Sequence, residues 1–537
     1  MFTITNRMNI ITIVKAFYHR QLNPVAALLL THTTQMLGYG WAGIFRKYLV
    51  DSPYMWWPAN LVQVSLFRAL HEVEIRPKGG LTRLQFFIMV LVSSFSYYII
   101  PNYLFPSITA LSFVCWVWKD SVTAQQIGSG LHGLGLGSFA LDWSTVAGFL
   151  GSPLATPGFA IVNMLVGFVL VVYVALPVAY WTDLYGARKF PIISSHVFDA
   201  NGKAYNISEI LIESTFEFNR AGYDGYSKVN LSVFFVLAYG LSFAGLAATV
   251  SHVALFHGRT IWQQTKASFQ DKFGDVHTRL MRKNYEPVPQ WWFYALLILV
   301  IGLSLFACEG FGRQLQLPYW GVILAMVLAF VFTLPVGVIT ATTNQQAGLN
   351  VISEMIIGYM YPGKPLANVA FKTYGTISMS QAITFLSDFK LGHYMKIPPK
   401  SMFLVQLVGT VITSLVCFST AWWLLTTIEN ICDPSKLPEG SPWTCPGDDV
   451  FYNASIIWGV VGPLRMRFRG WWARHNYILS GGLDAGVAFM ATLCYFTLQF
   501  NGIGGPRWWG LAVDDHCPLA KCPTAAGVRV EGCPVFH

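Results

Sequence analysis

The sequence predicts an all-α polytopic membrane protein, a multi-helix bundle in which some helices are broken or re-entrant. Of its 537 residues, 54% are hydrophobic and 11% are charged, whereas an ordinary soluble domain carries about 25% charged residues. The hydrophobic residues form blocks about twenty residues long, which is the length that an α-helix needs to cross a bilayer. Several blocks contain Gly, Pro or amide side chains, which are tolerated at membrane depth only where protein or a cavity shields them.

The apolar blocks recur from one end of the chain to the other. Seven of them are apolar throughout and long enough for one crossing: 84–105, 158–182, 229–256, 290–309, 317–342, 402–426 and 477–499. Five weaker segments carry polar or helix-breaking residues: 24–45, 54–70, 106–118, 347–361 and 366–389. We therefore expect an N-terminal segment at 1–23, a multi-span domain at 24–499 and a Cys-containing tail at 500–537.

Two long loops set the expected orientation. Loop 257–289 has six Lys and Arg in 33 residues, and loop 183–228 has five in 46. Because positive loops stay in the cytoplasm, we expect 257–289 to be cytoplasmic and 183–228 to lie outside. Asn206, in an Asn-x-Ser sequon within the second loop, is a possible glycosylation site and favours the same orientation.

Counting crossings onward from loop 257–289 extends this orientation. Segments 347–361 and 366–389 then form a pair, either out and back or re-entrant. The next loop, which carries Cys432 and Cys445, faces the oxidising side, so these cysteines are a possible disulfide. Asn453, just after this loop, is a second possible glycosylation site.

Polar residues concentrate in region 335–400, among apolar neighbours. They are Asn344, Gln345, Gln346, Asn350, Glu354, Lys372, Tyr374 and Gln381. Glu354 and Lys372 are 18 residues apart across a Pro/Gly break at 362–365, so a helical hairpin would bring them together. The pair is either a structural ion pair or part of a water-filled cavity in which Glu354 takes up and releases a proton. The amide side chains suit peptide groups because they both donate and accept hydrogen bonds.

Two further stretches indicate interrupted helices. Segment 125–159 is rich in Gly and predicts a re-entrant loop or a broken helix, with an interfacial loop as the alternative. The stretch KIPPK contains adjacent prolines between two lysines. We expect Pro398 and Pro399 to stop the preceding helix, and Lys396 and Lys400 to hold the break at the cytoplasmic surface.

The remaining residues argue against other classes of protein. No Ser/His/Asp arrangement, metalloprotease pattern or catalytic carboxylate pair is visible, so we expect no enzyme and no cofactor. The tail cysteines 517, 522 and 533 do not match a standard zinc spacing, so no metal site is predicted. Four other cysteines lie in apolar segments and are expected to be inert: Cys115, Cys308, Cys417 and Cys494. The net charge of +9 comes from short loops beside apolar blocks, which does not indicate nucleic acid.

Five stretches together resemble the oligopeptide transporter family, in its fungal branch. They are GYGWAGIFRKYLVDSPYMWWPANLVQVSLFRALHE, DVHTRLMRKNYEPVPQWW, NQQAGLNVISEMIIGYMYPGKP, FKTYGTISMSQA and LGHYMKIPPKSM. In the last, KIPPK looks like the family's KIPPR signature, with Lys400 in place of its final Arg.

The resemblance implies a multi-helix transporter bundle that carries small peptides with protons across the plasma membrane. The expected substrates are tetra- and pentapeptides and glutathione-like peptides, and the proton is the coupling ion. It also implies that Glu354, Lys372 and the 344–346 stretch line the pathway. A related branch of the family, which carries metal–chelator or siderophore complexes, is the alternative.

Two departures from the family pattern lead to further expectations. The family's N-terminal NPG region is not present, and the chain looks internally deleted near residue 463. Segment 454–464 has eleven residues and is too short to cross a bilayer, so we expect 454–476 to be irregular or badly packed. A shortened isoform that does not transport is therefore a third alternative.

Overall fold

A computed structural model describes most of the chain. The described residues are 22–72, 80–148, 150–212, 215–268, 276–427, 469–500, 508–511 and 515–536, with positions 11, 14, 15, 20 and 503. Contacts divide the chain into two compact units. Unit 1 comprises Met1–Asn60, Leu211–Asn219 and Leu241–Leu437, and unit 2 comprises Leu61–Ile210, Arg220–Gly240 and Pro438–His537.

The described part of the chain is a set of helices with seven candidate membrane spans. They are Arg83–Leu104, Gly158–Trp181, Val233–Gln263, Gln290–Glu309, Tyr319–Thr343, Pro399–Thr427 and Tyr477–Leu498. Each coincides with one of the seven strongly apolar segments, so the sequence prediction of an all-α polytopic membrane protein is confirmed.

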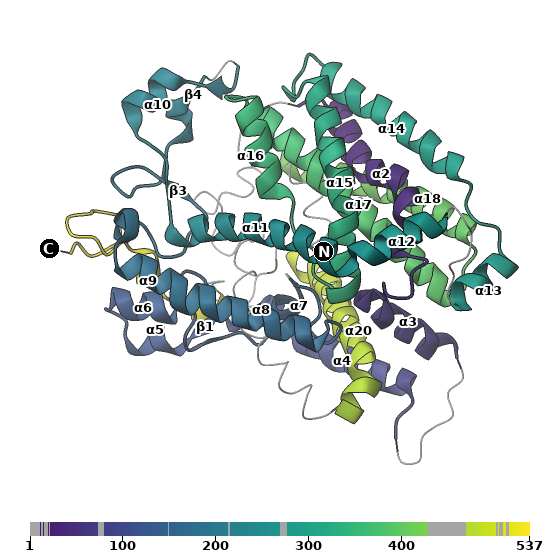
Figure 1. The fold of residues 1–537 in the computed structure, drawn as a ribbon. Coiled ribbons are helices and arrows are strands. Elements are labelled where there is room, and N and C mark those ends of the chain that lie inside the picture. Colours follow the sequence, from purple (N-terminus) through teal and green to yellow (C-terminus); the bar gives the residue numbers. More distant parts are fainter. Residues whose placement is uncertain are drawn as a thin grey trace. The chain divides into compact units, whose positions relative to one another are not determined.

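Unit 1 is built from long helices (Figure 1). They are α2 (Pro24–Leu49), α12 (Gly258–Ser268), α13 (Val276–Asn284), α14 (Gln290–Glu309), α15 (Tyr319–Thr343), α16 (Asn350–Met360), α17 (Pro365–Met395) and α18 (Pro399–Thr427), with strands β4 (Leu211–Ile212) and β5 (Glu217–Phe218). Helices α3 (Pro58–His71) and α11 (Val233–His252) belong partly to each unit, and the turn η7 (Val253–His257) follows α11.

Helix α2 is the central helix of unit 1 and packs against α14, α15, α17 and α18. It begins where the side chain of Asn23 accepts a hydrogen bond from the backbone of Val25 and Pro24 takes the first helical position. Three glycines let its neighbours approach. A Cβ on Gly38 would lie 2.2 Å from the backbone oxygen of Ser378, and a Cβ on Gly40 would lie 2.6 Å from Leu297. Such close helix packing through small residues is typical of membrane bundles.

The weaker segments 347–361 and 366–389 form a helical hairpin, and the short helix α16 in its first half follows an unwound limb at residues 344–349. Helix α17 has 31 residues and is about 46 Å long, whereas α16 has 11 residues and is about 16 Å long. A Cβ on Gly375, about 15 Å along α17, would lie 3.2 Å from Ser353 at the start of α16. The beginning of α16 therefore lies about a third of the way along α17, and residues 344–349 before it are not helical.

The KIPPK junction differs in detail from its prediction. Helix α17 ends at Met395, before the prolines, because Lys396 adopts the left-handed conformation with φ of 59°. Pro399 is the first residue of α18 rather than the stop of α17. The lysines are held locally: Lys400 pairs with Glu286, and Lys396 donates to the backbone of His393.

Unit 2 combines three candidate spans, Arg83–Leu104, Gly158–Trp181 and Tyr477–Leu498, with many short elements. Its helices are α4 (Arg83–Ile99), α5 (Phe113–Val117), α6 (Val122–Gly128), α7 (Trp143–Gly148), α8 (Gly158–Leu170), α9 (Leu176–Trp181), α10 (Arg220–Tyr226) and α20 (Arg469–Cys494). Its π and 3₁₀ turns are η2 (Ile100–Leu104), η3 (Pro106–Thr109), η4 (Val171–Ala175), η5 (Leu184–Lys189), η6 (Ile207–Ile210), η8 (Tyr495–Gln499), η9 (Trp509–Leu511) and η10 (Pro518–Lys521). Strand β1 (Leu111–Ser112) pairs antiparallel with β2 (Ser138–Phe139), and β3 (Val197–Phe198) with β6 (Asn230–Leu231).

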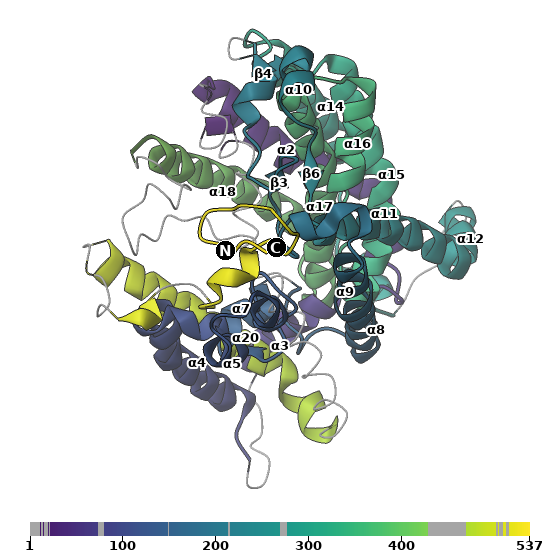
Figure 2. The ribbon, with the colours of Figure 1, turned by 90° about the vertical axis from the view of Figure 1, so that its left-hand side faces the viewer.

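Helices α4 and α20 lie side by side and run parallel (Figure 2). A Cβ on Gly482 would meet Val90, and one on Gly486 would meet Ser94, so both helices advance in the same direction. After α20 the chain returns to the end of α4, where the Trp508 indole donates to the backbone of Leu104. Both helices therefore end on the same side of the membrane.

The Gly-rich segment is broken. Helix α6 ends at Gly128, β2 follows, and α7 has six residues. Leu141 lies near the end of α4, because the Tyr97 hydroxyl donates to its backbone oxygen at 2.6 Å, whereas the Ser152 hydroxyl is 2.6 Å from the Ser480 hydroxyl, early in α20. The chain from Leu141 to Ser152 therefore runs along α4 and α20 without forming one continuous helix.

Some expectations fall partly or wholly outside the described residues. Cys432, Cys445 and Asn453 lie in 428–468, which the structure does not describe. The predicted irregular stretch 454–476 overlaps this range, but its last part is described. Helix α20 begins at Arg469, so the first alternative, irregular structure, is wrong for residues 469–476, whereas their side-chain packing lies outside what the structure describes.

Candidate functional site

The ion pair between Glu354 and Lys372 lies at the junction of α16 and α17. The Lys372 ammonium contacts the Glu354 carboxylate, and the two side chains remain 36% and 25% exposed, respectively. Asn368, one turn before Lys372, donates its amide to the backbone oxygen of Glu354 at 3.0 Å. The hairpin thus joins the two residues across the Pro/Gly break, in a pair that is only half-buried.

The amide residues that precede Glu354 lie in and beside the unwound limb. Asn344 ends α15 in the left-handed conformation, with φ of 62°, and Gln345 follows with its backbone N–H on the Thr343 hydroxyl. Gln346 is exposed, and Asn350 is the exposed first residue of α16. An unwound segment presents backbone N–H and C=O groups together with these side chains, which is how discontinuous helices form ligand sites in transporters.

Tyr374 and Gln381 are on α17 but do not join this pair. Tyr374 is fully buried, and its hydroxyl lies 3.1 Å from the Thr33 hydroxyl of α2. Gln381 is 6% exposed. Tyr374 therefore acts in the packing of α2 against α17, whereas Lys372 faces α16.

The sequence prediction missed Gln35, a buried amide on α2. Its side chain is 1% exposed, and neither its oxygen nor its nitrogen has a hydrogen-bond partner among the described residues. His32 and Tyr39, which share its helix face by spacing, contact the hydroxyls of Ser414 and Thr410 on α18, each at 2.6 Å. The hydroxyl of Thr376 on α17 is also buried without a partner. The run THTTQ at 31–35 in an apolar helix was the available signal.

Short contacts hold the two ends of this arrangement. At the α16–α17 turn, Lys364 pairs with Glu217, and the backbone of Phe218 donates to Gly363. At the other end of α17, the buried ammonium of Lys390 donates to the backbone oxygens of Val50 and Ser52, at 2.7 and 2.9 Å. Both ends of α17 are therefore fixed to other parts of unit 1.

Unit 2 contains a separate cavity of about 240 Å³. It is lined by Ser93, Ser94, Tyr97, Tyr98, Asp142, Trp143, Leu483 and Val487. The Asp142 carboxylate caps α7, accepting from the Ser144 and Thr145 backbones, and the Trp143 indole donates to Asp484 at 2.6 Å. Asp142, which lines the cavity, and Asp484, which contacts the lining residue Trp143, thus have donors from the protein itself, which indicates a structural role.

Comparison with known proteins places this arrangement in a family. The model of the family described as "OPT oligopeptide transporter protein" matches residues 2–467. The chain belongs to the oligopeptide transporter family. It is a multi-pass membrane protein of a transporter family, not an enzyme.

Curated relatives from Arabidopsis thaliana extend the likeness. The chain is 60% identical to oligopeptide transporter 1, over 98% of this chain and 80% of that protein. It is 58% identical to oligopeptide transporter 5 and 50% identical to oligopeptide transporter 7, again over 98% of this chain, covering 81% and 78% of those proteins. These relatives come from a plant, and they give no support to an assignment to the fungal branch.

Proposed function

We propose that this chain is a proton-coupled symporter of small oligopeptides at the plasma membrane. The observation that carries the proposal is the half-buried Glu354–Lys372 pair beside the unwound limb 344–349. Charged side chains inside a membrane cost free energy unless they pair with an opposite charge or face a water-filled cavity. The membership in a family of oligopeptide transporters supports oligopeptides as the substrate class, and within that class we propose tetra- and pentapeptides and glutathione-like peptides.

The pair provides a chemical route for coupling. When Glu354 is ionised, it holds the Lys372 ammonium. When Glu354 takes up a proton, the attraction disappears and Lys372 becomes available for a peptide carboxylate. The amide groups around 344–350 match the N–H and C=O groups of a peptide backbone. Binding of a proton to Glu354 and binding of a peptide carboxylate to Lys372 then favour each other. Each event breaks the Glu354–Lys372 contact, which the other event would otherwise have to break.

The test is uptake of labelled tetra- and pentapeptides by cells that lack their own peptide transporters. We expect uptake to rise at acidic external pH and Glu354→Gln to reduce it to background. Glu217→Gln is the matched control, because Glu217 also forms a half-exposed ion pair with a lysine in unit 1. Equal peptide uptake by Glu354→Gln and the unaltered chain would contradict the proposal. So would a result in which unlabelled metal chelates, but not unlabelled peptides, reduce the uptake of the label.

A second experiment separates coupling from a structural ion pair. Exchange of the charges, Glu354→Lys with Lys372→Glu, preserves an attraction between α16 and α17. If the pair only holds the hairpin, the exchanged variant transports like the unaltered chain. If the acid must lie on α16 to serve the pathway, the exchanged variant is inserted and folded but does not transport.

A non-transporting shortened chain is the second candidate, and one observation favours it. The match to oligopeptide transporter 1 extends over 607 aligned positions, more than the 537 residues of this chain. The relatives thus have residues within the matched span that this chain does not. If the chain reaches the membrane folded but gives no uptake, and a chain filled in from a relative does, the second candidate is correct.

A further inference from the structure

We infer that residues 515–536 form a disulfide-locked cap on the non-cytoplasmic end of unit 2, which places the C-terminal tail outside the cytosol. Two disulfides carry this inference. Cys115 is bonded to Cys517, 402 positions away in the sequence, and Cys522 is bonded to Cys533. The expectation that Cys115 is an inert core residue is therefore wrong, because the tail folds back onto the apolar segment that contains it.

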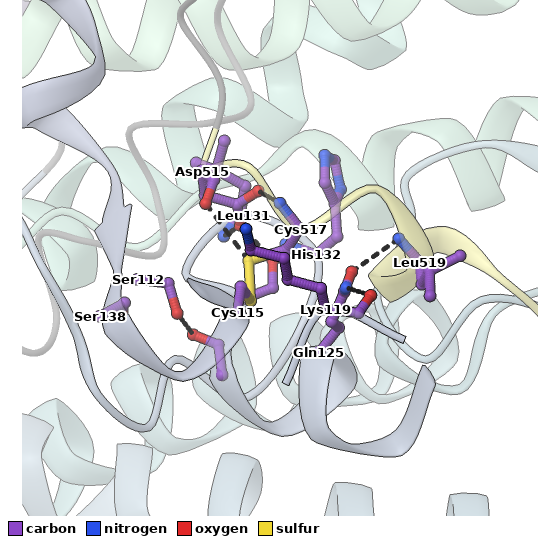
Figure 3. The surroundings of a disulfide bond; sticks show 12 residues. Ser112, Cys115, Lys119, Gln125, Leu131, His132, Ser138, Asp515, Cys517 and Leu519 are labelled. Carbon is purple, nitrogen blue, oxygen red and sulfur yellow. Dashed lines mark hydrogen bonds between the residues drawn. A yellow bond between two sulfur atoms is a disulfide. The ribbon is translucent and has the colours of Figure 1, made fainter. Parts of the chain in front are cut away.

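The first contact region of the cap surrounds the Cys115–Cys517 bond (Figure 3). Asp515 is fully buried and accepts hydrogen bonds from the Ser129 hydroxyl and from the backbone of Leu131, the latter at 3.3 Å. On the other side of the bond, the backbone of Leu519 donates to the Gln125 side chain at 2.8 Å. The tail therefore has polar partners on both sides of the disulfide, and they come from α6 and the loop after it.

The second contact region joins the tail to the end of the α8–α9 span. The Gln126 amide donates to the backbone oxygen of Cys522 at 2.9 Å and to the Tyr180 hydroxyl at 3.1 Å. Thr524 completes the contact: its hydroxyl lies 3.1 Å from that of Tyr180, and its backbone oxygen accepts from Arg188 at 3.0 Å. Cys522 thus lies between α6 and the start of loop 183–228.

These contacts put several segments at one end of unit 2. The ends of α4 and α9 and the start of loop 183–228 all contact the tail directly or adjoin residues that do. Stable disulfides form in oxidising compartments, and the cytosol keeps thiols reduced. The capped end therefore faces the outside or the lumen of the secretory pathway.

Two independent features agree with this side. Asn206 of the sequon lies in the same loop, exposed and close to β3, where a glycosylating enzyme in the lumen would reach it. The span Val233–Gln263 then crosses to the opposite side and brings the basic loop 257–289 to the cytosol, as the positive-inside rule requires. The free cysteines among the described residues, Cys308, Cys417 and Cys494, all lie in candidate spans.

The test uses the full chain with an epitope tag after residue 537. We expect an antibody to bind the tag on intact cells, without permeabilisation. We also expect a thiol reagent, followed by peptide mass spectrometry, to find Cys115–Cys517 and Cys522–Cys533 linked before reduction and alkylated only after it. A tag reached only in permeabilised cells, or tail cysteines alkylated without reduction, would overturn the inference.

A matched pair of variants tests the long-range bond. Cys517→Ser should free Cys115 for alkylation, whereas Cys417→Ser, which removes a free half-buried thiol, should leave both disulfides intact. Asn206→Gln should remove one glycan from the chain, seen as a faster-migrating band. If Cys115 in Cys517→Ser reacts only in denaturant, burial rather than a disulfide protects it in the folded variant. The disulfide-linked peptides of the unaltered chain then decide whether Cys115 and Cys517 are bonded.

Discussion

Units 1 and 2 both place polar groups beside apolar spans, but they satisfy these groups differently. In the described part of unit 1, the Gln35 amide and the Thr376 hydroxyl have no hydrogen-bond partners, and the Glu354–Lys372 pair is half-buried. In unit 2 the tail gives partners to the Gln126 amide nitrogen and the Tyr180 hydroxyl, the tail residue Asp515 accepts from Ser129, and two disulfides are added, although the Gln126 side-chain oxygen has no partner among the described residues. Polar groups without a partner in the protein can bind water or a ligand, whereas polar groups with partners in the protein stabilise the fold. The difference directs functional tests to unit 1 and structural tests to unit 2.

The largest effect is expected at the glycine contact in the centre of unit 1. Gly38→Ala would place a Cβ 2.2 Å from a backbone oxygen of α17, so α2 and α17 must separate. We expect a loss of about 3 kcal/mol of stability, measured by thermal unfolding in detergent. Gly409→Ala on α18, where a Cβ meets nothing within 4 Å, is the control. An equal change in stability for the two variants would show that the helix propensity of the residue, not its contact with α17, determines the effect.

Two buried amides in unit 1 provide the next contrast. Asn60 donates to the Ser387 backbone at 2.7 Å and accepts from its hydroxyl at 2.9 Å, so Asn60→Leu should destabilise the protein by about 2 kcal/mol. Gln35 has no hydrogen-bond partner in the part of the chain that the structure describes, so Gln35→Leu should leave stability unchanged or raise it. If Gln35 binds water or peptide in the pathway, the same variant lowers peptide uptake. Thermal unfolding and uptake of both variants separate stability from function.

A smaller effect is expected when one member of the candidate pair is removed. Lys372→Met leaves Glu354 without its ammonium partner in a half-buried site, which should cost about 1 kcal/mol, less than in a dry interior. Adding Glu354→Gln should recover most of this stability, because no uncompensated charge remains. Thermal unfolding gives the coupling between the two changes, and purely additive losses would exclude an interaction.

The smallest effect concerns the exposed pair at the KIPPK junction. The hydrogen bond from Lys400, and then its charge, lowers the pKa of the Glu286 carboxyl. The contribution is present above the ordinary pKa of a glutamate and is lost as pH falls through the lowered value. The difference in melting temperature between the unaltered chain and Lys400→Met should be small near neutral pH and shrink further in acid. A difference that grows in acid would contradict this sign.

Sequence reasoning was most successful where a local pattern decides the outcome. The seven strongly apolar segments correspond to the seven candidate spans, because length and hydrophobicity are properties of each segment alone. The polar stretch 344–372 and its Pro/Gly break also indicated a hairpin. The left-handed Lys396 that ends α17 was missed, because the nearby prolines are the stronger local signal.

The sequence by itself determined that this chain crosses a membrane many times, because apolar blocks of spanning length have no other stable environment. It also determined the polar region at 335–400. Only the tertiary structure decided which polar groups have partners: Gln35 is left open, Glu354 meets Lys372, and Cys115 meets Cys517 from the far end of the chain. The reason is that pairing depends on which helices pack side by side, and residues hundreds of positions apart carry no local signal of that packing.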